Sequence, residues 1–255
     1  WKINLNLTHY KNKITYLPDE KKTTVMDGHG GYMNGSRYYG EDLPINTWYM
    51  KRFAGLSEDG LSLWYYTDKE TNEEKTTTTY STGDFYLCGD PNPDLYGGFG
   101  TSITFHGFDL STQFSYLVGG LTYDYGYAGM MGNPTATSVG NRWHKDVLKA
   151  WSPENPSSTI PRWHFNDLNT TGSSDRFLID GSYLNLQNIQ VGYTLPDSWT
   201  SHLKIKNLRL YFVCDNVYYW SKRKGLDPRR SISGVGTSGK IAPFRTYSGG
   251  ISLQF

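Results

Sequence analysis

The chain has 255 residues and a formal net charge of +1, so it lacks the strongly basic field that nucleic-acid binding needs. Glycine (28), tyrosine (21) and tryptophan (8) are abundant, while the hydrophobic fraction is only 37%. No run approaches the roughly eighteen apolar residues of a transmembrane helix, which excludes a helical membrane protein. This composition favours one large all-β domain with polar turns.

The chain begins inside an alternating segment. Over residues 1–8 the odd positions are apolar and the even positions are polar, which is typical of a strand with one apolar face. We expect a chain that starts within a strand to be part of a longer protein. Further strands are predicted at residues 14–17, 45–55 and 61–66, joined by short turns at 11–13 and 56–60, with polar loops at 18–44 and 68–96.

The clearest local pattern is a hairpin. Residues 98–105 and 108–118 both alternate, and His106-Gly107 between them predicts a two-residue turn. A long irregular segment follows at 119–182, with one helical turn expected near residues 144–150.

The last strands complete the pattern. Alternation over residues 183–195 slips by one position, which predicts a β-bulge near Gln187-Asn188. Residues 208–215 alternate, and a basic glycine-rich loop covers 221–242. In the terminal strand the apolar face carries Tyr247, Gly249, Ile251, Leu253 and Phe255. An apolar strand ending on phenylalanine suits a bacterial outer-membrane β-barrel, in which the last strand closes the barrel.

Connection lengths support the same fold class. Short turns alternate with long loops, an asymmetry that outer-membrane barrels show and soluble sandwiches do not require. The count is nine strands, and nine cannot make a complete bacterial single-chain barrel. The sequence therefore predicts an antiparallel transmembrane β-barrel portion with long extracellular loops.

Two other classes of protein stay open at this point. The same strands can pack face to face as a soluble extracellular β-sandwich that binds glycans. A glycosidase fragment would need two carboxylates placed about 5–10 Å apart, and no motif places such a pair.

No catalytic or metal motif is evident. Asp90, Asn92 and Asp94 alternate like the start of a calcium loop, but the required glycine and closing glutamate are missing. His144 and His164 lack a third zinc ligand. Cys88 and Cys214 can pair or remain free. We predict no enzyme activity, no cofactor and no metal.

Several segments resemble SusC-like TonB-dependent transporters. They are GDPNPDLYGGFGTSITFHGFDLS (89–111), WSPENP (151–156), IPRW (160–163), SSDRFLIDGSYLNLQNIQVGYTLP (173–196), KIKNLRLYFVCDNVYYW (204–220) with GLDPR (225–229), and PFRTYSGGISLQF (243–255). His106 stands where that family usually has lysine, and Asn185 where arginine is common. The match is weaker over residues 18–80.

The resemblance implies a 22-stranded barrel in the outer membrane of a Bacteroidota-type bacterium. Residues 1–255 would supply its carboxy-terminal part, about nine strands, and the plug domain and the segment that contacts TonB would lie upstream. Such proteins import oligosaccharides or peptides, use energy delivered through TonB and carry a SusD-like lipoprotein as an external lid.

The candidate functional residues lie on the external loops. Aromatic faces stack on sugar rings and make strong protein contacts, and arginine binds polar groups. The residues predicted to contact ligand or lid are Trp143, Trp151, Trp163, Arg142, Arg162 and Tyr125. The alternative is that they pack their loop against itself or the barrel rim. The basic run Lys222, Arg223, Lys224, Arg229 and Arg230 is interpreted as a solvated or lipopolysaccharide-facing loop, and Tyr218, Tyr219 and Trp220 as an interfacial girdle.

Overall fold

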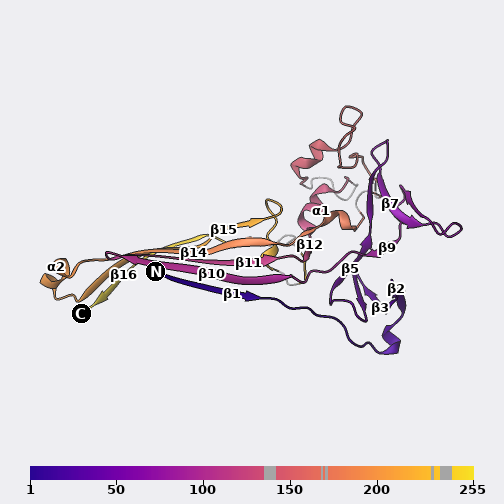
Figure 1. The fold of residues 1–255 in the computed structure, drawn as a ribbon. Coiled ribbons are helices and arrows are strands. Elements are labelled where there is room, and N and C mark those ends of the chain that lie inside the picture. The colour runs from indigo at the N-terminus through magenta and orange to yellow at the C-terminus, as the bar shows by residue number, and fades with distance from the viewer. Residues whose placement is uncertain (135–141, 168, 170–171, 231–232, 236–242) are drawn as a thin grey trace.

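The protein has a long flat stem with a broad head at one end (Figure 1). The computed structural model describes residues 1–134, 142–167, 169, 172–230, 233–235 and 243–255. The stem is one antiparallel sheet, and three smaller sheets lie in the head. Both chain termini lie on the stem, away from the head.

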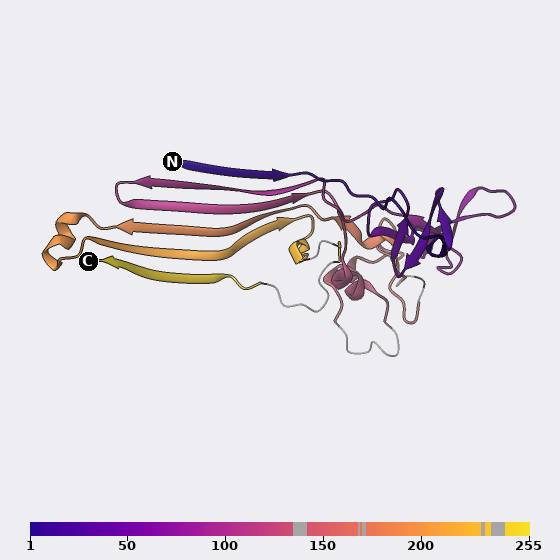
Figure 2. The ribbon, with the colours of Figure 1, turned by 90° about the horizontal axis from the view of Figure 1, so that it is seen from below.

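The stem has six strands that follow one another as an up-and-down meander (Figure 2). In spatial order they are β1 (Lys2–Thr8), β10 (Leu95–Phe105), β11 (Phe108–Val118), β14 (Tyr183–Thr194), β15 (Asn207–Ser221) and β16 (Thr246–Gln254). Connections at the end remote from the head are short. One is the turn at 106–107, and the other, at 195–206, contains α2 (Asp197–Thr200) and the 3-10 helix η5 (Ser201–Leu203).

The register of the stem separates two faces. One row across five strands consists of Phe105, Phe108, Tyr193, Leu210 and Ile251, which all lie on the apolar face of the stem. The residues between them along each strand, such as Asp109, Ser111 and Gln113 on β11, form the polar face.

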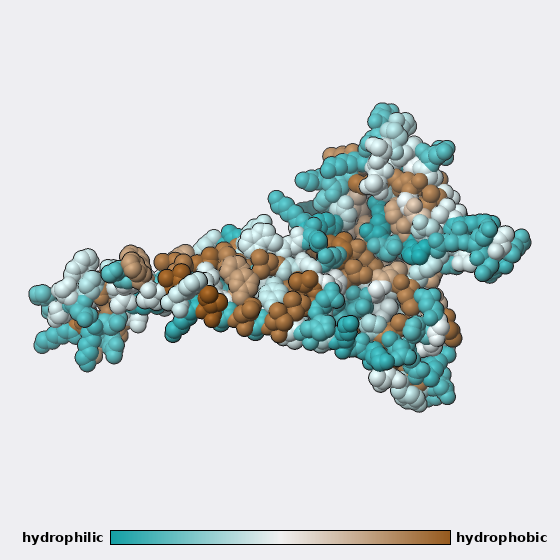
Figure 3. All heavy atoms as spheres, in the orientation of Figure 1, coloured by the Kyte–Doolittle hydropathy of each residue, from teal (hydrophilic) through white to brown (hydrophobic). Residues whose placement is uncertain are grey.

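Apolar side chains of the stem are exposed rather than packed into a core. Leu110 is 40% exposed and Ile251 66%. Figure 3 shows a band of apolar atoms along the stem, bounded by hydrophilic atoms at both ends. The soluble-sandwich alternative requires these side chains to meet in a dry two-layer core, and their exposure contradicts it.

Three local predictions are confirmed. The hairpin turns at His106 and Gly107, both of which have positive φ, as a two-residue turn of this kind requires. The pairing of β14 with β15 shifts between Leu186 and Asn188, where the bulge was predicted. The terminal strand β16 pairs with β15 over residues 246–254.

The prediction of nine barrel strands is wrong for the described chain, because the stem contains six. Residues 14–17 form no strand, and the segments predicted at 45–55 and 61–66 belong to small sheets in the head. Every residue from Thr47 to Lys51 is buried, so this strand is covered on both faces and cannot face lipid. Residues 9–94 therefore form one long connection between β1 and β10, and the turns predicted at 11–13 and 56–60 lie within it.

The head is built from the three long connections at 9–94, 119–182 and 222–245. The first of its sheets comprises β2 (Thr24–Met26), β3 (His29–Asn34), β4 (Arg37–Gly40), β5 (Thr47–Lys51) and β9 (Phe85–Leu87). The second comprises β6 (Phe53–Leu56), β7 (Ser62–Thr67) and β8 (Glu74–Thr77). The third pairs β12 (Leu121–Tyr123) with β13 (Leu178–Asp180). Its helices are α1 (Tyr125–Met131) and the 3-10 helices η1 (Asp19–Lys21), η2 (Lys145–Lys149), η4 (Asp175–Phe177) and η6 (Pro228–Arg230). None of the described helices is long and apolar enough to span a bilayer.

Trp48 is the centre of the head core. It is 0% exposed and packs in one cluster with Met50, Tyr123, Met131 and Phe177. Its indole Nε1 donates to the carbonyl of Leu121 at 3.1 Å, which ties β5 to β12. One residue thus links the first long connection to the second.

Cys88 packs beside this cluster and is expected to react slowly with thiol reagents. Cys88 and Cys214 are both free. Burial raises the pKa of Cys88 to about 11. Since only the thiolate reacts, alkylation of Cys88 by iodoacetamide at pH 8 should be about one hundredfold slower than that of an unstructured cysteine. A mass-spectrometric time course measures the rate, and a rate equal to that of a free cysteine peptide would contradict this packing.

Candidate functional site

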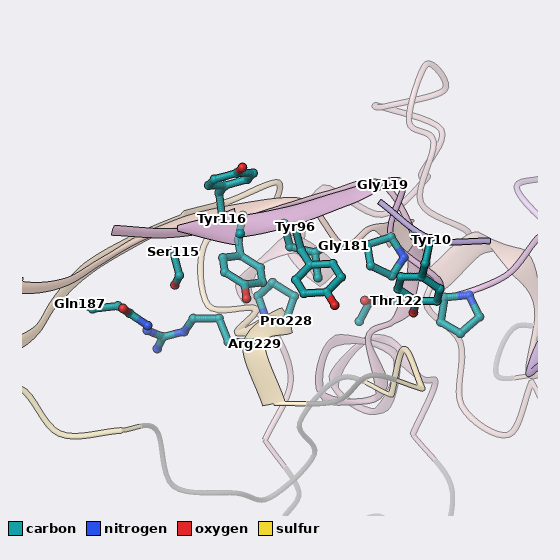
Figure 4. A pocket seen from close by; sticks show the side chains of 16 residues that line it. Tyr10, Tyr96, Ser115, Tyr116, Gly119, Thr122, Gly181, Gln187, Pro228 and Arg229 are labelled. Carbon is teal, nitrogen blue, oxygen red and sulfur yellow. The ribbon is translucent and has the colours of Figure 1, made fainter. Parts of the chain in front are cut away.

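A cavity of about 520 Å³ opens on the polar face where the stem meets the head. We call it the tyrosine cavity. It is lined by Tyr10, Pro91, Pro93, Tyr96, Gly97, Ser115, Tyr116, Leu117, Gly119, Gly120, Thr122, Gly181, Tyr183, Gln187, Pro228 and Arg229. In Figure 4 the side chains of Ser115, Gln187 and Arg229 lie on the same side of the strands. Strand ends and three separate connections thus meet around one space.

This lining combines four tyrosine rings with uncharged polar side chains, glycines and prolines. Tyr10 and Tyr96 meet edge to face, with ring centroids 6.1 Å apart and planes at 81°. Tyr96 and Tyr183 lie at the head ends of β10 and β14. Aromatic faces beside neutral donors and acceptors suit an uncharged ring or an apolar side chain of a solute.

Gly120 permits the close chain contact beneath the cavity. Its φ is +73°, a conformation that favours glycine, and a Cβ there would lie 2.4 Å from the carbonyl oxygen of Pro91. A side chain at this position would therefore push apart two segments that line the cavity.

The bulge brings polar groups of two strands to the same place. Between Leu186 and Asn188 the β14–β15 ladder is interrupted, and Asn216 on β15 has a positive φ of 52°. Gln187 and Asn216 both line a second hollow of about 380 Å³, shallow and open to solvent, which we call the side cavity. Its other lining residues are Asn185, Asp227, Arg229 and Pro243, so Gln187 and Arg229 border both cavities.

Arg229 makes several side-chain hydrogen bonds in this region. Its Nε and Nη2 donate to the two carboxylate oxygens of Asp227 at 2.8 and 2.7 Å. Its Nη1 donates to Asn185 Oδ1 at 2.7 Å and Asn216 Oδ1 at 2.9 Å. The Asp227 carboxylate raises the pKa of Arg229 above its ordinary value, so the guanidinium stays charged and that charge is compensated within the protein.

Arg209 makes a second such pair on the polar face, on β15 close to the short-connection end. Its Nε and Nη2 donate to Asp109 Oδ1 and Oδ2 at 2.9 and 2.6 Å, across Gly192 of the intervening strand. A Cβ at Gly192 would lie 2.4 Å from the Asp109 carboxylate, so glycine leaves the room that this pair needs. Arg209 does not border either cavity.

The loop residues predicted as ligand or lid contacts are partly brought together. Trp143 and Trp163 meet edge to face at 5.5 Å, and the indole of Trp143 donates to the Gly132 carbonyl at 3.1 Å. Trp151 lies against Gly60, whose carbonyl also accepts from the backbone N–H of Arg162.

The remaining two predicted contacts are exposed, as Trp163 is. Arg142 is exposed, and Tyr125 is exposed beside Tyr123, at 4.5 Å between ring centroids. A role of all six residues in ligand or lid contact remains a prediction.

The terminal strand presents Tyr247, Ile251, Leu253 and Phe255 as exposed side chains. Tyr247 stacks on Phe212 of the neighbouring strand at 6.1 Å. Tyr218 and Trp220, at the head end of β15, are exposed and meet edge to face at 4.8 Å. Closure of a barrel by this strand stays a prediction.

The interpretation of the basic run as a solvated loop is wrong for two of its residues. Arg223 is paired with Asp124 and lies over the ring of Tyr127 at 3.7 Å. Arg229 is paired with Asp227, as described above. Both arginines are therefore partly buried beside an aspartate and are not fully solvated.

Sequence reasoning missed the tyrosine cavity. Tyr96 and Tyr183 can be found from alternation, as residues on the polar face at strand ends. Tyr10 and Arg229 carry no such signal, because they follow or precede strands in irregular segments. In the described ranges no three histidine, cysteine, aspartate or glutamate side chains gather as a metal site.

Comparison with known proteins gives one consistent result. No family model matches the sequence. TonB-dependent receptor P3 of Formosa agariphila is 28% identical over 285 residues, covering 100% of this chain and 27% of the receptor. TonB-dependent receptor SusC of Bacteroides thetaiotaomicron is 27% identical over 266 residues, covering 100% of this chain and 24% of SusC. The chain thus spans about a quarter of the length of these relatives.

A solved structure of the RagAB peptide transporter shows the same fold. The TM-score is 0.80 at 23% identity, over 99% of this chain and 27% of the transporter chain. The chain thus resembles part of a TonB-dependent receptor over its whole length, a class of outer-membrane β-barrels, and its two-faced antiparallel stem matches the fold of part of the RagAB transporter chain.

Within that class the similarity is to receptors of the SusC/RagA type, and the chain corresponds to a C-terminal quarter of them. The family is one of transporters and is not enzymatic. The resemblance predicted from the sequence motifs is confirmed.

Proposed function

We propose that residues 1–255 form the carboxy-terminal part of a 22-stranded outer-membrane barrel, whose plug domain lies in a part of the protein outside this chain. The observation that carries the proposal is the two-faced stem, because exposed apolar rows suit lipid and the polar face suits a watery lumen. The head would then lie outside the cell, since external loops of such barrels are long and inner turns short.

The whole protein is proposed to import oligosaccharides or peptides with energy delivered through TonB. A SusD-like lipoprotein would cover the external side and contact the head. The support is the similarity to SusC and the shared fold with the RagAB peptide transporter. In this proposal the tyrosine cavity forms part of the wall along which solute passes, and the six predicted loop residues contact solute or lid.

Uptake by intact cells tests the proposal. Cells expressing the full-length receptor are given fluorescent oligosaccharides or fluorescent peptides of matched mass, with and without a deletion of TonB. We expect one of the two solute classes to accumulate only when TonB is present. Mass spectrometry of the tagged receptor, purified from the outer membrane, should identify a surface lipoprotein as its partner. Accumulation that is equal without TonB, or absent for both classes, would contradict the proposal.

A further inference from the structure

The segment 226–229 lies against the polar face of the stem instead of extending into solvent. Leu226 is 3% exposed, and Asp227 and Pro228 are also buried. Ser221, the last residue of β15, fixes the start of the segment, because its hydroxyl donates to the carbonyl of Leu226 at 2.9 Å. This segment is therefore a shelf on the polar face, directly beside the tyrosine cavity.

Arg229 holds the shelf to two strands of the stem. Its ion pair with Asp227 fixes the turn of the shelf itself, and its Nη1 bridges Asn185 of β14 and Asn216 of β15. Asn216 in turn donates to the carbonyl of Pro243, at 2.8 Å, in the segment that leads to β16. The guanidinium also lies over the ring of Tyr219 at 4.4 Å. Removing this one side chain would break the side-chain hydrogen bonds of the shelf to Asn185 and Asn216 and leave the Ser221–Leu226 bond to β15.

The position of Arg229 between the two cavities gives these contacts a consequence. Arg229 and Gln187 line the tyrosine cavity and the side cavity alike. Of these two, Gln187 is the unpaired bulge residue within β14, whereas the Arg229 guanidinium is held by oxygens of Asp227, Asn185 and Asn216. The wall between cavities of about 520 and 380 Å³ therefore depends on the Arg229 side chain.

We propose that Arg229 is a positioning residue that keeps the shelf at residues 226–229 in place, separates the two cavities and so sets the width of the space available to solute. The statement that solute passes through this space rests on the proposed function. The separation of the two cavities by Arg229 does not rest on it. Arg229 is not a receptor for anionic groups, because its charge is already compensated by Asp227 and its donors point at carboxylate and amide oxygens. The wall selects by size and shape, not by charge.

Thiol labelling in intact cells tests this wall. A reporter cysteine replaces Ser115, which lines the tyrosine cavity, in the full-length receptor lacking its native cysteines. Small thiosulfonate reagents of either charge should react at equal rates after each rate is divided by that of the same reagent with a free thiol. In Arg229→Gln, a bulky maleimide–polyethylene glycol should react with the reporter cysteine more than about tenfold faster than in the reporter receptor that keeps Arg229. The reason is that losing one partner of a buried ion pair strongly destabilises the shelf that the pair holds.

Two further variants make the result specific. Arg209→Gln removes the other bidentate arginine–aspartate pair of the polar face, away from both cavities, and should leave the bulky reagent slow. Arg229→Lys keeps a charge beside Asp227 but cannot bridge two asparagines as well, so the bulky reagent should again be fast. If Arg229→Gln fails to assemble, Arg229→Lys carries the test.

Three outcomes would overturn the inference: a bulky-reagent rate that Arg229→Gln and Arg229→Lys leave unchanged, an equal rise in Arg209→Gln, or a marked preference for the anionic small reagent. The labelling measures geometry and needs no transport. A negative labelling result would therefore not contradict the proposed import function. Likewise, a receptor that shows no uptake would not contradict the inference about Arg229.

Discussion

Replacing Phe114 by arginine is expected to prevent assembly of the receptor in the outer membrane. Phe114 lies on the apolar face near the middle of β11 and stacks on Phe99 at 4.5 Å with nearly parallel rings. An arginine facing lipid near the bilayer midplane destabilises a barrel by about 2–4 kcal/mol, and the aromatic stack is lost as well. The measurement is the amount of folded, heat-modifiable receptor in outer-membrane fractions on cold gel electrophoresis.

Ser111→Arg is the matched control for this prediction. Ser111 lies on the same strand, three residues away, and so on the polar face, where it pairs with Ser102 and Gln190. The same side chain placed toward water should assemble nearly as well as the unmodified protein. Equal loss in both variants would mean that the two faces of the stem do not differ in environment.

Replacing Trp48 by alanine is expected to unfold the head while the stem stays intact. Trp48 is fully buried, the Arg37 guanidinium lies 3.1 Å from its ring centroid, and its indole N–H satisfies the Leu121 carbonyl. Truncating a buried tryptophan costs about 3–5 kcal/mol. The stem strands contribute nothing to this cluster, so their pairing should persist.

Limited proteolysis of receptors in intact outer membranes measures this effect. In Trp48→Ala, cleavage should appear within residues 9–94 and 119–182, while the stem strands remain protected. Val25→Ala is the control, because Val25 is exposed on β2 and its truncation should change the cleavage pattern little. A head that resists protease equally in both variants would show that Trp48 does not hold the connections together.

The stem was predictable because its signal is local. Alternation of side chains in a strand needs only neighbouring residues, and it gave the hairpin at 106–107, the bulge near Gln187 and the terminal strand. The same signal fails for residues 47–51, which are buried on both faces and so do not alternate. Segments 45–55 and 61–66 do contain strands, but a local pattern cannot tell a strand of the stem from one in the head, and residues 14–17 form no strand; for these reasons the count of nine exceeded the six strands of the stem.

The tyrosine cavity and the shelf could not be predicted from the sequence, because their residues come together only in the folded chain. Asp227 lies two residues from Arg229, but Asn185 and Asn216 come from separate strands, and only the register brings them to the same guanidinium. Without these partners, Arg229 was interpreted as one cation of a solvated run. Trp48 likewise meets Leu121 and Tyr123 only after the first two long connections fold together.

Nitroxide scanning along β11 tests the central claim most directly. Single labels at successive positions from 110 to 115, in the full-length receptor reconstituted in bilayers, report collisions with lipid-soluble oxygen and with a water-soluble nickel complex. The account predicts oxygen access at Leu110, Thr112 and Phe114, and nickel access at Ser111, Gln113 and Ser115, two patterns of period two that are out of phase. Low access to both reagents at all six positions, as in a dry protein core, would contradict it.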